Sequence, residues 1–215
     1  MVENQETRIV IDTGPDFRQQ MLRYRVKELD AVIFTHEHKD HIAGLDEVRA
    51  FNYLQGKNMP VYATPRVQEA LKREFAYIFA EEKYPGIPRV DLFELDNDPV
   101  TVGEILLRPV NVMHYKLPVK GFRIKNFAYI TDANYISTEE KQKLSGLDVL
   151  VLNALRRESH ISHFTLEEAI QLVHELNPRK AYFTHISHQL GKHADLSNTL
   201  PANIELAVDG LQIVI

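Results

Sequence analysis

The 215-residue sequence contains no cysteine and has no apolar run approaching the eighteen residues that a membrane-spanning helix needs. Without cysteine, disulfides and thiolate metal ligands are excluded, which fits a reducing compartment. No signal-like segment opens the chain, so we expect neither secretion nor membrane insertion. These absences together predict a cytoplasmic protein.

Basic residues are also in the minority, with 25 Lys and Arg against 30 Asp and Glu and a net charge of −5. This balance argues against an extended nucleic-acid-binding surface. At 44% hydrophobic and 26% charged residues, the composition is that of an ordinary globular chain, long enough for a well-buried core. Because no repeat, linker or low-complexity segment interrupts it, we expect a single domain over residues 1–215.

Residues 35–41, with the sequence THEHKDH, carry a dense set of potential metal ligands. Residues 30–34 before them are typical of a buried strand, and residues 45–51 after them have the apolar spacing of a helix. The loop between holds three imidazoles and a carboxylate, which are more donors than packing requires: His36, His38, Asp40 and His41. Imidazole and carboxylate are suitable ligands for zinc and manganese, so a metal site is predicted here.

Strands and helices alternate along the rest of the chain, which predicts an α/β fold. Further strands are expected over residues 7–14, 60–63, 104–107, 126–131, 148–152 and 181–184. An Asp-Gly turn at residues 209–210 predicts a final hairpin, with strands over residues 204–208 and 211–215.

Helix starts have their own signals. Thr64 followed by a proline predicts an N-cap, with helical apolar spacing continuing up to a breaker at residues 84–86. Capping-box patterns begin at Ser137 and Thr165, each with a glutamate three residues later, and the second opens a helix over residues 166–176.

A site for two metal ions needs more ligands than one loop provides, and three further candidates follow expected strands. They are His114 after residues 110–113, Asp132 after residues 126–131, and His185 after residues 181–184. Taken singly, each is also explained as a capping or surface residue.

The pattern His36-x-His38-x-Asp40-His41 after an apolar strand resembles the signature of the metallo-β-lactamase fold superfamily. The three later candidates resemble that superfamily's third, fourth and fifth motifs in order and position. The resemblance implies a four-layer αβ/βα sandwich with two divalent metal ions, zinc or manganese with iron as a further option. It implies the following ligands: His36, His38 and His114 for one ion, Asp40, His41 and His185 for the other, and Asp132 between both.

Residues 11–18, with the sequence IDTGPDFR, resemble the first acidic motif of the same superfamily. This resemblance implies that Asp12 orients the ligand loop, although the residue is also explained as a turn cap. The superfamily normally opens with an earlier strand and a glycine-rich turn, and this sequence has neither. We therefore expect the fold without its usual first N-terminal strand and with a shortened or exposed sheet edge.

The tripeptide His163-Phe164-Thr165 before a capped helix resembles the H-x-T element of tRNase Z and of phosphoribosyl cyclic phosphodiesterases. The resemblance implies that His163 is a general acid that protonates the leaving oxygen, whereas the alternative is a plain loop histidine. A helix N-terminus and nearby metal ions disfavour imidazolium. Such an acid needs a carboxylate partner, for which the candidates are Glu158, Asp12 and Asp40.

Residues 11–18, 121–132, 163–165 and 184–188 together resemble the PhnP-type branch, the cyclic phosphodiesterases of carbon–phosphorus lyase metabolism. The founding member of that branch has a cysteine-rich zinc site, and the lack of cysteine here leaves the physiological substrate open. The implied reaction is hydrolysis of a small cyclic or nucleotide-like phosphodiester by a hydroxide that bridges the metals, with Asp40 as the proton acceptor.

Three alternatives stay open at this point. RNA 3′-end processing of the tRNase Z kind needs a basic arm, and no segment has that charge. Hydrolysis of a lactone, thioester or β-lactam does not require the H-x-T acid. A non-catalytic metal-binding module is the third alternative.

The expected partner is a small phosphodiester, without a membrane or an extended nucleic acid, and the expected assembly is a homodimer. The negative net charge does not exclude an anionic substrate, because two dications would dominate the local field. His160, His188 and His193 are candidates for substrate contacts, and His174 is expected on the polar face of its helix.

Overall fold

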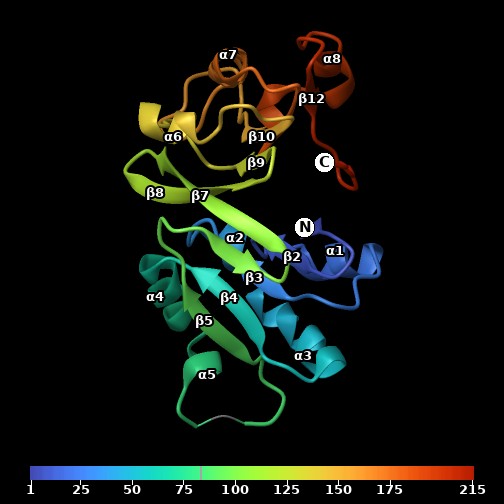
Figure 1. Cartoon of the computed structure of the whole chain (residues 1–215), viewed down its shortest axis with the longest axis vertical. Coiled ribbons are helices and arrows are strands. Elements are labelled where there is room, and N and C mark those ends of the chain that lie inside the picture. The colour runs from blue at the N-terminus through green and yellow to red at the C-terminus, as the bar shows by residue number, and fades with distance from the viewer. Residues whose placement is uncertain (83) are drawn as a thin grey trace. The chain divides into compact units, whose positions relative to one another are not determined.

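The computed structural model describes residues 1–82 and 84–215, which form two compact units, Met1–Leu107 and Arg108–Ile215. Each unit has its own sheet and helices (Figure 1) and its own hydrophobic core. The single domain expected from the sequence stays a prediction, because two compact units can belong to one cooperative fold or to two.

The first unit is built on a five-stranded sheet in which the strands follow chain order. The strands are β1 (Val2–Glu3), β2 (Arg8–Ile11), β3 (Ala31–Ile33), β4 (Met59–Ala63) and β5 (Val90–Glu94). All neighbours are parallel except β1, which pairs antiparallel with β2. The strands expected near residues 7–14, 30–34 and 60–63 are confirmed, while β1 and β5 were not predicted.

Helices connect the successive parallel strands of this unit. They are α1 (Phe17–Arg23), α2 (Lys39–Ile42), the 3₁₀ helix η1 (Leu45–Val48), α3 (Arg49–Gln55), α4 (Pro65–Glu74) and α5 (Ala76–Phe79). Alternate strand residues such as Val32 and Phe34 pack with helix residues such as Leu45 and Val67 in one buried cluster. Burial on both faces explains why β3 reads as a continuous apolar run.

The helix predicted from Thr64 begins as expected but does not reach the breaker. The hydroxyl of Thr64 accepts from the backbone N–H of Val67, and Pro65 takes the first helical position. At Phe75 the backbone leaves the helical region (φ −119°, ψ 43°), so α4 ends there and the short α5 follows. Residue 83, within the expected span, lies outside the described residues.

The second sheet runs in the order β12-β11-β10-β9-β8-β7-β6. Its strands are β6 (Val100–Val102), β7 (Ile105–His114), β8 (Leu117–Ile124), β9 (Phe127–Ile130), β10 (Val149–Asn153), β11 (Lys180–Thr184) and β12 (Ile204–Leu206). β6 pairs with the start of β7, within the first unit. Pairs among β7, β8 and β9 are antiparallel, whereas β9 to β12 are parallel. The strands expected near residues 104–107, 126–131, 148–152 and 181–184 are confirmed.

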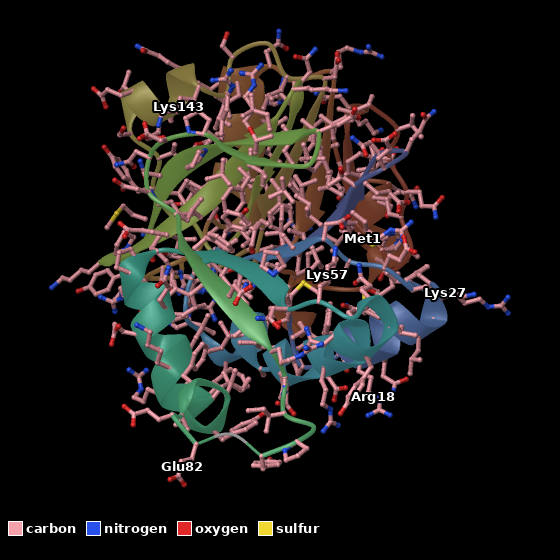
Figure 2. The ribbon with its side chains drawn as sticks, turned by 60° about the horizontal axis from the view of Figure 1, so that its bottom comes forward. Met1, Arg18, Lys27, Lys57, Glu82 and Lys143 are labelled. Carbon is pink, nitrogen blue, oxygen red and sulfur yellow. The ribbon has the colours of Figure 1, made fainter. Side chains whose placement is uncertain are left out.

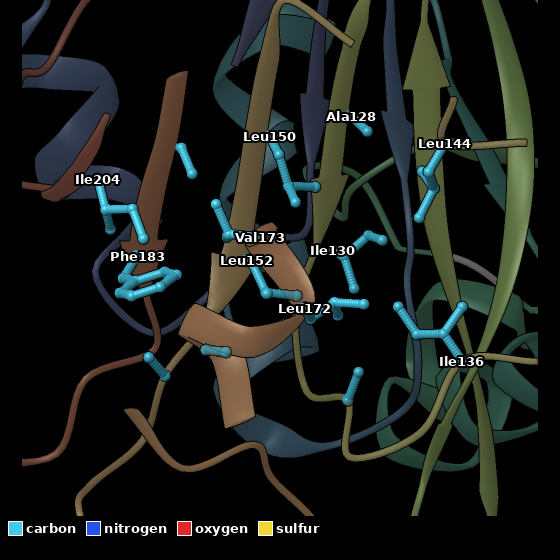
Figure 3. Packing of buried hydrophobic residues seen from close by; sticks show 14 of the residues in the cluster. Ala128, Ile130, Ile136, Leu144, Leu150, Leu152, Leu172, Val173, Phe183 and Ile204 are labelled. Atoms are coloured by element: carbon cyan, nitrogen blue, oxygen red, sulfur yellow. The ribbon is translucent and has the colours of Figure 1, made fainter. Parts of the chain in front are cut away.

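The core of the second unit forms where α7 (Leu166–Leu176) packs on the parallel strands (Figure 3). Leu172 and Val173 of α7 lie against Leu150 and Leu152 of β10, and Phe183 of β11 joins the same cluster. The helix bounds agree with the predicted 166–176. The remaining helices of the unit are α6 (Thr138–Gln142), the 3₁₀ helix η2 (His188–Leu190) and α8 (His193–Ser197).

Only one of the two predicted capping boxes is complete. Thr165 accepts from the backbone N–H of Glu168, and the Glu168 carboxylate accepts from the backbone N–H of Thr165. At α6 the Ser137 hydroxyl accepts from the Glu140 backbone, but the Glu140 carboxylate accepts from the backbone and side chain of Asn111 instead. Asn111 of β7 therefore takes the place of the Ser137 backbone N–H as the donor to the Glu140 carboxylate.

The predicted C-terminal hairpin is wrong, although its first strand, expected over residues 204–208, forms as β12 (Ile204–Leu206) and pairs with β11. The turn forms, with Gly210 at φ 90° and the backbone N–H of Leu211 donating to Val208. Residues 211–215, however, form no strand with any described residue, and Val214 is 97% exposed. A strand needs a buried face to fix its register, and this segment has none.

Charged side chains cover the exterior of each unit (Figure 2), and both signs are mixed. Lys27 extends into solvent, while Arg18 and Lys57 pair with the carboxylates of Glu47 and Asp30 at 3.7 and 3.0 Å. Such exposed pairs contribute little to stability.

The capping box of α7 gives a test of how this helix is held. Thr165→Ala removes the side-chain acceptor for the Glu168 backbone and should lower the free energy of unfolding by about 1 kcal/mol, measured by urea denaturation. Ser145→Ala, at an exposed turn position, is the matched control and should change it by less than about 0.5 kcal/mol. Equal values for both variants would show that the cap does not stabilise the unit.

Candidate functional site

The first unit brings its predicted metal ligands together at the end of β3. His36 and His41 are buried, and their ring centroids lie 4.1 Å apart, with His38 at 4.6 Å from His36. Asp40 is exposed, and its carboxylate lies 3.4 Å from Nε2 of His41. The short helix α2 begins directly after His38 and carries Asp40 and His41. A strand, a loop and one turn of helix thus collect three imidazoles and one carboxylate.

Asp12, which lies after β2, fixes the orientation of this loop. Its Oδ1 accepts from the backbone N–H of Thr35 at 2.8 Å, and its Oδ2 lies 2.8 Å from the Thr35 hydroxyl and 2.7 Å from Nδ1 of His41. A carboxylate only accepts hydrogen bonds, so His41 carries its proton on Nδ1 and the Thr35 hydroxyl donates to Asp12. That hydroxyl can then only accept from Nδ1 of His36, 3.0 Å away. One carboxylate therefore selects the tautomer of both imidazoles and leaves Nε2 as the basic nitrogen of each.

Small residues let the two loops of this network approach closely. The backbone N–H of Thr13 donates to the carbonyl of His41, and the N–H of Gly44 donates to the carbonyl of Thr13, each at 2.8 Å. A Cβ on Gly44 would lie 2.4 Å from the carbonyl oxygen of Gly14, and a Cβ on Gly14 would lie 2.7 Å from that of Asp40. Side chains larger than hydrogen would push the ligand loop away from Asp12.

The second unit brings together its own candidates at the ends of three strands and in the loop before α7. The His163 ring lies 4.4 Å from that of His114 and 4.8 Å from that of His185, on which it stacks. Asp132 is buried, with Oδ1 2.6 Å from the Thr131 hydroxyl and 3.1 Å from Nδ1 of His185. The predicted residues of each unit are therefore clustered within that unit.

A backbone carbonyl positions His114 in this unit, and a side-chain amide positions the turn after Asp132. Nδ1 of His114 donates to the carbonyl of Ser162 at 2.8 Å, which leaves Nε2 as its basic nitrogen. The buried side chain of Asn153 accepts from the backbone N–H of Ala133 at 2.8 Å and donates to its carbonyl at 3.0 Å. This pair of bonds anchors the residue after Asp132 to the end of β10.

His163 has a position that suits two roles. One ligand atom each of His114, Asp132 and His163 lies within 4.8 Å of the others, so these three residues could hold a metal ion. The sequence analysis predicted His163 as an acid and not as a ligand. Its buried Nδ1 has no hydrogen-bond partner among the described residues, which indicates that a group from outside the chain completes its environment.

Electrostatics keep the His163 ring neutral. Burial lowers the pKa of His163 to about 4, and the neighbouring His185, His114 and His160 lower it further, while the charge of Asp132 raises it. Burial, followed by Arg156 and His114, also lowers the pKa of His160. The carboxylate whose charge raises the pKa of His163 is Asp132. The partners expected from the sequence, Glu158, Asp12 and Asp40, stay predictions.

Three of the predicted site residues hold a strained backbone conformation. Asp12, Asp132 and His185 all adopt left-handed conformations, with φ of 60°, 52° and 53°. Each follows a strand directly or after one residue, where the left-handed turn redirects the chain. Such conformations cost a residue other than glycine on the order of 1 kcal/mol or more and persist where the surrounding structure requires them.

The remaining predicted residues differ in their environment. Nδ1 of His160 lies 3.3 Å from the backbone N–H and from the hydroxyl of Ser162, and its ring lies 5.0 Å from that of His163. His188 and His193 are exposed at the starts of η2 and α8, where Nδ1 of His193 lies 3.3 Å from the Ser197 hydroxyl. His174 is exposed on α7, as expected.

Two positioning residues, Thr35 and Asn153, were not predicted from the sequence. A signal existed for each. Thr35 separates the apolar strand from His36, and Asn153 is the polar end of the apolar run of β10. No helix among the described residues combines the length and apolarity required to cross a membrane.

Residues 7–186 match the family described as the beta-lactamase superfamily domain, so the chain belongs to this superfamily of hydrolases. A solved structure titled as a new diphosphatase from the PhnP family is 36% identical and aligns with a TM-score of 0.91 over 99% of this chain and 82% of its own. The metallo-β-lactamase fold predicted from the sequence is confirmed, with two mixed sheets.

Curated relatives extend beyond this chain. An octanoyltransferase of Porphyromonas gingivalis is 37% identical over 210 residues, which are 97% of this chain and 42% of that protein. Exodeoxyribonuclease YycJ of Bacillus anthracis is 26% identical over 164 residues, 71% of this chain and 56% of its own. The chain thus spans about half the length of the curated relatives it matches.

The low pKa of His163 leads to a prediction about the stability of the folded protein at acidic pH. Between its ordinary value of 6.5 and about 4, the unfolded chain binds a proton at this residue that the folded chain does not. The free energy of unfolding of the metal-free protein should therefore fall as the pH is lowered through this range. His163→Phe should lose less stability between pH 6.5 and 4, measured by urea denaturation. A ring of His163 that titrates near pH 6.5 by NMR would contradict the burial argument.

Proposed function

We propose that this chain is a metal-dependent hydrolase of small phosphodiesters. The observation that carries the proposal is the fixed tautomers of His36, His41 and His114, each of which keeps Nε2 as its basic nitrogen. Structural histidines need no such arrangement, whereas metal ligands do. Superfamily membership supports the hydrolytic reaction.

The donor chemistry fits divalent ions. Imidazole nitrogens and carboxylate oxygens suit zinc, manganese or iron, and no thiolate is present. We propose two ions per chain, on the basis of the superfamily's ligand pattern, with the ligands that this pattern names: His36, His38, Asp40, His41, His114, Asp132 and His185. When bound, such ions supply Lewis-acid stabilisation of charge at phosphorus and lower the pKa of water.

The chain's own groups have separate tasks in this proposal. Asp40 is exposed and accepts the proton of the attacking water. His163 donates a proton to the leaving oxygen. Its depressed pKa disfavours the imidazolium in the free protein, but a bound anionic phosphate beside the ring would raise that pKa, as the charge of Asp132 already does. Proton donation would then depend on bound substrate.

Phosphodiesters are favoured over the other substrates of the superfamily for two reasons. The H-x-T element around His163 supplies an acid that acyl transfer does not need. The relatives include exodeoxyribonucleases and a ribonuclease Z, whose named activities act on phosphodiester bonds. Mixed surface charge and a net charge of −5 argue for a small substrate instead of a long nucleic acid.

Hydrolysis of an organic diphosphate is the second candidate. A specific observation favours it, because the solved structure at 36% identity is described as a diphosphatase. The same chain residues could act on a P–O–P bond, whose phosphate leaving group needs less help from an acid than an alkoxide does. The octanoyltransferase carries less weight, because this chain covers 42% of that protein.

Metal content and substrate class can be tested together. After reconstitution with Zn²⁺ or Mn²⁺, elemental analysis should find two ions per chain, and the protein should hydrolyse a cyclic ribose phosphate or a bis-aryl phosphodiester. Asp132→Ala should lower the metal content and abolish turnover, whereas Asp16→Ala, at an exposed position, should keep both. One ion or none would overturn the dinuclear site. Turnover of a lactone or thioester alone, or tight and salt-dependent tRNA binding, would overturn the substrate class.

The variant His163→Ala tests whether His163 is a general acid or a metal ligand. With an alkoxide leaving group, kcat should fall by roughly 10²–10⁴, the usual contribution of positioned proton transfer. With a nitrophenolate, which leaves without a proton, the loss should be much smaller, and the metal content should stay unchanged. Equal losses on both substrates would assign His163 to phosphate positioning, and loss of metal would make it a ligand of the kind that the group with His114 and Asp132 allows.

A further inference from the structure

Three large apolar side chains are exposed on the loops that carry the candidate site residues of the second unit. Tyr115, 51% exposed, directly follows His114. Tyr135, 58% exposed, lies three residues after Asp132, and Ile161, 66% exposed, lies in the loop before α7. Scattered apolar side chains are common on surfaces, but three on adjoining site loops form a pattern that packing does not explain.

A single residue, Asn134, ties these three loops together. Its Oδ1 accepts from the backbone N–H of Tyr115 at 2.8 Å, and its Nδ2 donates to the carbonyl of Ile161 at 3.1 Å. Its backbone N–H donates to the carbonyl of Met113 at 2.9 Å. The backbone N–H of Met113 donates to the carbonyl of Tyr135, also at 2.9 Å. The three apolar side chains are therefore carried by backbone whose position is fixed by direct hydrogen bonds.

Tyr115 holds a strained backbone conformation in this arrangement. It lies in the two-residue turn between β7 and β8 with φ 59°, where glycine or asparagine would be ordinary. The bond to Asn134 offsets part of that strain. The ammonium of Lys116 lies over the Tyr115 ring, 5.2 Å from its centroid, which places a positive charge on one face of the ring and leaves the other face for stacking.

We propose that Tyr115, Tyr135 and Ile161 form a subsite for a planar aromatic group of the substrate, namely a nucleobase, and that Asn134 is its positioning residue. The subsite rests on the proposed phosphodiester hydrolysis and names the substrate class as a small nucleotide phosphodiester. Aromatic faces stack on bases of any sequence, and an isoleucine adds apolar contact at the edge. Lys116 would favour the negative charge of the same substrate.

A second copy of the chain is the competing occupant. A stable dimer buries roughly 800 Å² on each partner, far more than three side chains provide. Tyr115 directly follows His114, Ile161 directly follows His160, and Asn134 bonds to the backbone of both Tyr115 and Ile161, which favours a group covalently joined to the scissile phosphate.

The test compares two substrates with the same scissile ring, adenosine 2′,3′-cyclic phosphate and the base-free methyl riboside 2′,3′-cyclic phosphate. Tyr135→Ala in the metal-loaded protein should lower kcat/KM for the nucleotide by roughly 5- to 100-fold and change the base-free substrate by less than about 2-fold. Tyr135→Phe should keep the nucleotide preference. Asn134→Ala should reduce the preference in the same direction, mainly through KM. Tyr53→Ala, at an exposed position of α3, is the control and should keep it.

The other possible results decide between the nucleobase subsite, a dimer surface and a failure of the proposed function. Equal losses on both substrates by Tyr135→Ala, with circular dichroism unchanged, would overturn the subsite. A concentration-dependent dimer that Tyr135→Ala disrupts, seen by light scattering, would assign the surface to a second copy. Should the wild-type protein hydrolyse neither substrate, the proposed function fails, and calorimetry with adenosine alone decides the subsite: binding lost in Tyr135→Ala supports it, and no binding overturns it.

Discussion

The candidate site of the first unit depends on one carboxylate. Asp12 accepts from the backbone and hydroxyl of Thr35 and from Nδ1 of His41, and through the hydroxyl it also determines the proton position on His36. The glycines at positions 14 and 44 exist in this arrangement because any larger side chain would separate the two loops. Loop direction and the imidazole tautomers thus depend on the same carboxylate, and the close loop spacing that it requires depends on the two glycines.

In the second unit, neutral groups orient His114 and the turn after Asp132, while the Asp132 carboxylate lies 3.1 Å from Nδ1 of His185. A carbonyl orients His114, and the amide of Asn153 fixes the turn that carries Asp132. Neutral partners add no charge beside His163, whose pKa is already lowered mainly by burial. The two units therefore present similar donors, but only the first adds a further negative charge behind them.

Much of the fold and of the candidate site could be predicted from the sequence, because metal-ligand residues and strand ends leave strong local signals. The motif at residues 35–41, the strands before Asp132 and His185, and the capping box at Thr165 were all visible in the printed order of residues. The C-terminal hairpin could not be predicted reliably, because its second strand depends on a buried face that the structure does not provide for Val214. Likewise Glu140 prefers Asn111 of β7 to its own helix cap, a choice made by contacts distant in sequence. Thr35 and Asn153 act through partners that only the folded chain reveals.

The left-handed backbone at Asp12, Asp132 and His185 has a consequence for how such a chain can change. Glycine at any of these positions would relieve backbone strain, but at Asp12 it would also remove the acceptor for Thr35 and His41. Relief of strain and loss of loop order would therefore come with the same substitution, so the strained conformation persists only together with the side chain that holds it.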